Sequence, residues 1–183
     1  SPQGKTAWLS KPYEGEEDYR GDPALTDEQA EAFIAAAISS NQQLLAHCNG
    51  DAAGDQFIKY YKKGLTASTN PNKNNLRPVM IHCQTARSDQ LDAMAELGMI
   101  PSIFVAHTYY WGDVHLKNFG PQRGHKISPA RSALDRGLNI TFHQDAPVVP
   151  PQMLFTIWCA VNRQTRSGVT IGPQERISVY EAL

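Results

Sequence analysis

The sequence predicts an α/β fold built around a parallel sheet, on three observations. Short apolar segments alternate with segments of helical periodicity over residues 26–183. A polar residue able to bind a ligand follows each of four apolar segments: His47, His82, His107 and Asp145. They follow one another at intervals of 35, 25 and 38 residues, close to the ~30 residues that one strand–helix–strand unit needs.

The first elements are a loop and an amphipathic helix. Residues 1–25 are polar and rich in proline and glycine, which indicates a long surface loop. Thr26 is expected to cap the helix, with Gln29 in capping-box register. The apolar residues recur at helical spacing and predict one buried face: Ala30, Phe33, Ile34, Ala37 and Ile38.

Four strand–helix units are expected to follow. The strands are predicted at 43–46, 78–81, 101–106 and 138–142. Helices are predicted at 55–63, after Ser88 as N-cap to Gly98, after Ser128 as N-cap and Pro129 as first residue to Gly137, and from about Pro151. A long loop is predicted between His107 and Ser128. Ser178 is expected to cap a helix that would continue past Leu183, which indicates a piece of a longer polypeptide.

The spacing of the strand–helix units along the sequence fits two architectures. Short strands that are apolar throughout are typical of a parallel sheet covered on both faces. A doubly wound sheet and a (β/α) barrel both satisfy this pattern. An eight-unit barrel takes about 250 residues. The chain would therefore be one domain, 1–183, with a loop-rich opening segment at 1–25 and four β/α units, about half a barrel, at 26–183.

Composition excludes several classes of partner. The formal net charge is −1 and no run of Lys or Arg occurs, so we expect neither nucleic acid nor an anionic membrane as a partner. No apolar run approaches the ~20 residues of a membrane span, and mean hydropathy is −0.43. Three cysteines argue against a disulfide framework. We expect a cytoplasmic protein that acts on a small molecule.

The strand-end residues predict a metal site. The carboxyl ends of parallel strands meet at one edge, with neighbouring strands ~4.8 Å apart. Imidazole and carboxylate groups suit Zn²⁺ and similar divalent ions. His47, His82 and Asp145 are therefore the predicted ligands. Such a metal activates water, and a nearby carboxylate can take its proton.

Other polar residues have two possible roles each. His143 and Asp145 share one face of their strand, so His143 is expected to contact substrate or orient a ligand. Asp51 either caps a helix N-terminus or supports the site. His115 and His125 are expected to be solvated loop residues.

Three motifs carry a resemblance to a known family. His47-Cys48-Asn49-Gly50-Asp51 resembles the H-x-x-G-D signature of the amidohydrolase superfamily, and more narrowly of the TIM-barrel metal-dependent hydrolases that include the N-substituted formamide deformylases. His82-Cys83-Gln84 resembles their E-H-x-Q segment, with Ile81 in place of Glu. Asp145-Ala146-Pro147 resembles their S-D-x-P segment, with Gln144 in place of Ser.

The resemblance implies a fold, an activity and residue roles. It places the chain at strands 5 to 8 of a TIM-type barrel. His47 and His82 would bind a divalent metal, zinc above all, and Asp145 would bind metal and act as general base. The family's H-x-H pair and strand-4 ligand would lie upstream, since the sequence contains no H-x-H. The implied reaction is hydrolysis of a C–N bond in a non-peptide amide, with the isolated chain inactive.

The aromatic loop after the third strand is the expected substrate wall. It contains His107 and Trp111, and the resemblance implies substrate contacts there. Plain packing of the same aromatic side chains is the alternative.

Two other functions compete with a metal hydrolase. Cys48 or Cys83 could be a nucleophile with a neighbouring histidine as base. A side chain adjacent to a strand-end histidine points to the opposite face, which argues against this. Alternatively, a half-barrel with open edges could be a non-catalytic module that forms homodimers.

Overall fold

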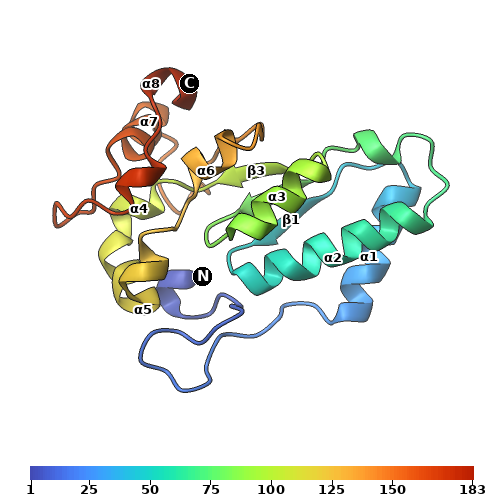
Figure 1. Cartoon of the computed structure of the whole chain (residues 1–183), viewed down its shortest axis with the longest axis horizontal. Helices are drawn as coiled ribbons and strands as arrows, with labels where there is room; N and C mark the ends of the chain where they lie inside the picture. The colour runs from blue at the N-terminus through green and yellow to red at the C-terminus, as the bar shows by residue number, and fades with distance from the viewer.

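The computed structural model describes residues 1–183 and contains a four-stranded parallel sheet (Figure 1). The strands are β1 (Leu45–Cys48), β2 (Val79–His82), β3 (Ile100–Ile103) and β4 (Thr141–Phe142), in the order β1-β2-β3-β4. His47 pairs with Ile81 and Cys48 with His82, so the histidine-bearing ends of β1 and β2 lie in register. The predicted α/β fold is confirmed.

Helices connect and cover the strands. They are α1 (Asp27–Ser39), α2 (Asp51–Ala67), α3 (Ser88–Glu96), α4 (His107–Tyr110), α5 (Gly112–Gly124), α6 (Ala130–Leu134), α7 (Met153–Asn162) and α8 (Val179–Ala182), with short 3-10 helices at Pro2–Gly4, Lys73–Asn75 and Pro173–Glu175. In Figure 1, α1 and α2 lie side by side and α3 lies beside the sheet. No helix has both the length and the apolar composition needed to cross a membrane.

The first helix forms as its capping pattern predicts. The Thr26 hydroxyl accepts a hydrogen bond from the Gln29 amide, and the Gln29 side chain accepts one from the Thr26 amide. Ala30, Ile34 and Ile38 are buried. Ser178 and Glu181 make the same reciprocal bonds at the start of α8.

One predicted core residue is exposed. Phe33 keeps 59% of its surface exposed. Together with Leu45 of β1, which is 60% exposed, it lines a largely apolar groove of about 410 Å³ along the free edge of that strand. Because β1 has a neighbouring strand on one side only, its free edge leaves the side chains of Phe33 and Leu45 exposed.

The predicted long loop after the third strand is wrong. The strand ends at Ile103, and the residues from His107 onward form α4 and α5, with a kink at Gly120 where φ is +69°. Asn118 of α5 donates a hydrogen bond to the Pro2 carbonyl oxygen at 3.0 Å. Pro2 lies more than 100 residues before Asn118 in the sequence, so a local sequence pattern cannot predict this contact.

The opening segment is also less exposed than predicted. It has little regular structure, but two of its apolar side chains, Leu9 and Tyr13, are buried. They pack in a second, smaller core with Phe119, Ile127 and Ile171 of the C-terminal half.

Two predicted caps are wrong by one residue. Arg87 precedes α3 in the N-cap position, and the Ser88 hydroxyl instead accepts a hydrogen bond from Arg136. Pro129 precedes α6, while Ser128 has a left-handed backbone with φ of +51°. The amide of Ser128 donates to the Gln84 carbonyl oxygen at 2.8 Å, a bond between two separate strand–helix units.

Candidate metal centre

Three histidines meet where the carboxyl ends of the strands converge. His47 lies in β1, His82 is the last residue of β2, and His143 follows β4 directly. The ring centroid of His82 lies 4.5 Å from that of His47 and 5.0 Å from that of His143. The parallel order of the strands therefore gathers imidazoles from three separate units at one place.

His82, His143 and Asp145 form a group that fits a metal ion. One ligand atom from each lies within 4.8 Å of the others. Nδ1 of His82 and Nε2 of His143 are 3.3 Å apart. That separation equals the edge of a tetrahedron whose centre lies ~2.0–2.1 Å from each nitrogen, the usual zinc–nitrogen distance. The donor set and its spacing thus suit a divalent cation.

The predicted ligands are brought close together, with one addition. His82 and Asp145 belong to the group, whereas His47 lies beside it, exposed, with Nε2 3.3 Å from the Asn49 amide nitrogen. Its role as a ligand stays a prediction. His143 joins the group, and Ser102 of β3 orients it through a 3.0 Å bond to Nδ1. The sequence signal for His143 is its two-residue spacing from Asp145 on one strand face.

Burial keeps the central imidazoles neutral. Desolvation, with His47 and His143 nearby, lowers the pKa of His82 to about 3. Desolvation also lowers the pKa of His143, although the Asp145 carboxylate partly opposes this. At neutral pH both rings therefore have a free lone pair, which is the form that binds metals.

The backbone at the site adopts a conformation that side chains disfavour. His82 and Cys83 have φ of +71° and +48°, and Asp145 has φ of +53°. A left-handed backbone in a residue other than glycine costs on the order of 1–3 kcal/mol, and such residues concentrate at functional sites. Two of the three are members of the candidate metal group.

His107 and His115 differ from their predicted environments. His107 begins α4 instead of ending a strand, and its ring centroid lies 4.6 Å from that of Trp111. His115 is fully buried in α5, and its Nε2 lies 3.0 Å from Nδ1 of His107. His125 is half-buried and accepts a hydrogen bond from the Gly172 amide. Neither His115 nor His125 is a solvated loop residue, because the segment is helical and packs on the core.

The thiols are poorly placed for nucleophilic chemistry. Cys48 and Cys83 are buried in the main hydrophobic core. Burial raises the pKa of the Cys48 thiol to about 12 and that of the Cys83 thiol well above its usual range. A thiol held protonated in this way is inert, which argues against the cysteine alternative.

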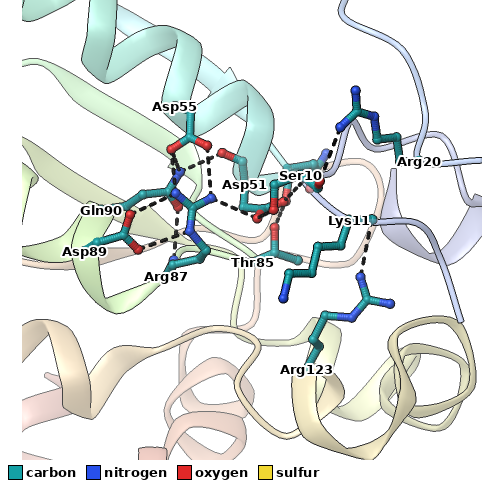
Figure 2. A network of polar contacts seen from close by, with 11 residues as sticks. Ser10, Lys11, Arg20, Asp51, Asp55, Thr85, Arg87, Asp89, Gln90 and Arg123 are labelled. Carbon is teal, nitrogen blue, oxygen red and sulfur yellow. Dashed lines mark hydrogen bonds and ion pairs between the residues drawn. The ribbon is translucent and has the colours of Figure 1, made fainter. Parts of the chain in front are cut away.

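Asp51 joins three segments around the site (Figure 2). Its carboxylate accepts hydrogen bonds from the amide of Ser10, at 2.9 Å, and from the Ser10 hydroxyl. It also accepts one from Arg87 at 2.9 Å, and Arg87 in turn binds Asp55 and Asp89. The N-cap of α2 is Gly50 and no side chain caps this helix. The Asp51 carboxylate instead ties the opening segment to the loop that follows β2.

We expect Arg87→Met to destabilise the protein by about 2–3 kcal/mol. The substitution leaves the mostly buried Asp51 carboxylate without its cation, and hydrogen bonds to charged groups contribute about 1.5–3 kcal/mol. Asp89→Asn is the matched control, because the Asp89 carboxylate is 68% exposed and such pairs contribute below about 1 kcal/mol. Calorimetric melting of both variants checks this; equal melting temperatures would contradict it.

The chain is similar to known proteins along its whole length. The family model described as "Amidohydrolase family" matches residues 1–183. The N-substituted formamide deformylase of Arthrobacter pascens is 31% identical over 103 residues, which is 56% of this chain and 19% of that protein. The chain therefore spans about a fifth of this relative.

Two solved structures share the fold. An uncharacterized metal-dependent hydrolase from Pyrococcus furiosus superimposes with a TM-score of 0.79 at 22% identity, covering 100% of this chain and 35% of that one. Its counterpart from Pyrococcus horikoshii OT3 gives 0.84 at 20% identity, with 100% and 36% covered. The four parallel β/α units are those of part of a TIM-type barrel, and the chain belongs to the amidohydrolase family.

Proposed function

We propose that the whole protein is a metal-dependent hydrolase and that this chain contributes part of its metal centre. The observation that carries the proposal is the convergence of ligand atoms from His82, His143 and Asp145 within 4.8 Å at the carboxyl ends of the strands. In α/β barrels this end carries the chemistry. His47, 4.5 Å from His82 between ring centroids, is the proposed further ligand.

The bound ion would supply a Lewis acid that activates water near neutral pH, and zinc suits the donor set. Asp145 is the proposed general base. Its carboxylate is exposed and accepts no hydrogen bond from the rest of the chain, so it is free to take a proton from the attacking water. It can then pass that proton to the departing nitrogen.

We infer a C–N bond as the target, in an amide that is not a peptide. Support comes from the 31% identity to a protein named N-substituted formamide deformylase. N-substituted formamides are therefore the first substrates to assay, and an amine and formate are the expected products. The isolated chain, which spans about a third of the two solved structures, is expected to be inactive alone.

Metal removal from the full-length enzyme tests the proposal. Dialysis against a chelator should abolish turnover, and added zinc should restore it, with metal content measured in parallel. His47→Asn and His143→Asn, assayed for bound metal, distinguish which histidine completes the ligand set. Arg136→Met removes an ion pair with Asp92 that involves no member of the metal group, so it is the control and should keep its metal. Full turnover in metal-free enzyme would disprove the proposed function.

A further inference from the structure

A second pair of histidines lies beside the candidate metal group and has no part in the metal proposal. His107 and His115 are 3% and 0% exposed, and their rings stack with centroids 5.2 Å apart. Nδ1 of His107 and Nε2 of His115 share one hydrogen bond of 3.0 Å. Nδ1 of His115 is buried and has no partner.

Burial makes both rings neutral. Desolvation lowers the pKa of His107 to about 2 and that of His115 to about 4. Each neutral imidazole carries one proton, and only one proton occupies the bond between them. The pair therefore has two arrangements, which differ in the ring that donates.

The unpartnered Nδ1 of His115 distinguishes the two proton arrangements of the histidine pair. If His107 donates from Nδ1, His115 must carry its own proton on Nδ1, as a buried N–H without an acceptor. If His115 donates from Nε2, its Nδ1 is only an unused acceptor. Buried orphan N–H groups are rarer in proteins than under-used acceptors. The second arrangement is favoured, and it puts the proton of His107 on Nε2.

That proton is available beside the metal group. Nε2 of His107 bonds to no atom of the chain, and it is not among the buried unpartnered atoms, so it retains access to solvent. The Phe104 ring lies near both sets of histidines: its centroid is 4.5 Å from that of His107 and 5.3 Å from that of His143. The Nε2–H group is thus a fixed donor one aromatic ring away from the metal group.

We propose that His107 donates a hydrogen bond from Nε2 to a carbonyl oxygen of the substrate, and that His115 is the positioning residue that holds His107 in this tautomer. The inference rests on the proposed hydrolase function, because it takes the bound molecule to be a carbonyl compound. It predicts that the site accepts a carbonyl or carboxylate oxygen at His107 and rejects an N–H group there. A donor of this kind gains strength as negative charge develops on the oxygen.

Three variants of the full-length enzyme test the assignment. His107→Phe should lower kcat about 100-fold or more, as loss of an oxyanion donor does. His115→Phe keeps the ring stack but removes the donor, and it should lower kcat about tenfold. His115→Gln can donate from its amide nitrogen and should recover most of that loss. Bound metal should be unchanged in all three.

The tautomer itself gives a readout independent of activity. Long-range ¹H–¹⁵N spectra of enzyme labelled with ¹⁵N-histidine should report His107 protonated on Nε2, and His115→Phe should redistribute its tautomers. A proton on Nδ1 of His107, or wild-type kcat in well-folded His115→Phe, would overturn the assignment. If the enzyme cleaves no amide, the inference of a C–N bond fails by itself, and the spectra still decide the tautomer. If His115→Phe does not fold, the wild-type spectrum and His115→Gln decide it.

Discussion

Replacing Asp145 by Asn should lower kcat of the full-length enzyme about 10³-fold or more. The proposed base takes a proton from water, and general base catalysis contributes about 10²–10⁴-fold. An amide oxygen still occupies the ligand position but accepts no proton at neutral pH. Asn also tolerates the left-handed backbone at this residue, where φ is +53°, so the fold should persist.

Metal content and melting temperature separate the two roles of Asp145. A folded variant that keeps its metal but loses turnover supports the role as base. A folded variant that loses its metal shows that Asp145 acts chiefly as a ligand. Asp135→Asn, at an exposed i,i+4 pair with Arg131, is the matched control and should be fully active. Full activity of Asp145→Asn would remove the assigned role.

Arg163→Met should destabilise the protein by about 3–5 kcal/mol, the largest expected change in stability. Arg163 is 0% exposed and donates to the carbonyl oxygens of Ile127, Ser128 and Ile171 at 2.6, 2.9 and 2.8 Å. Methionine fills much of the volume but leaves the carbonyls of Ile127 and Ile171 without a donor, whereas the Ser128 carbonyl keeps the Ala130 amide at 2.8 Å. Each unsatisfied buried group costs about 1–3 kcal/mol.

Arg166 provides the matched control for this prediction. It lies three residues further along the chain and is exposed, so Arg166→Met should change the free energy of unfolding by less than about 0.5 kcal/mol. Calorimetric melting of both variants measures the difference. Equal melting temperatures would show that the Ile127 and Ile171 carbonyls find other donors when Arg163 is removed.

Local sequence pattern predicted the elements that depend on local physics. Thr26 with Gln29 and Ser178 with Glu181 form their capping boxes because both partners lie within one helical turn. The alternation of apolar strands with helices predicted the parallel sheet, since such strands are covered on both faces. Pleat alternation predicted that Cys48 points away from His47, and the Cys48 side chain is buried in the main core.

The candidate site was predictable only in part. Placing His82 and Asp145 at strand ends follows from the order of the units, because parallel strands end at one edge. Whether His47 or His143 lies within ligand distance of His82 and Asp145 depends on the distances between side-chain atoms across the sheet. The spacing of residues along the sequence does not predict those distances.

The sequence by itself determined the α/β class, the order of the units and the strand-end position of His82, because these depend on periodicity and on neighbours along the chain. Only the tertiary structure decided that residues 107–124 are helical, that His115 is buried against His107, and that Asp51 binds Ser10 and Arg87. These features depend on contacts between segments far apart in the chain, and such contacts override weak local preferences.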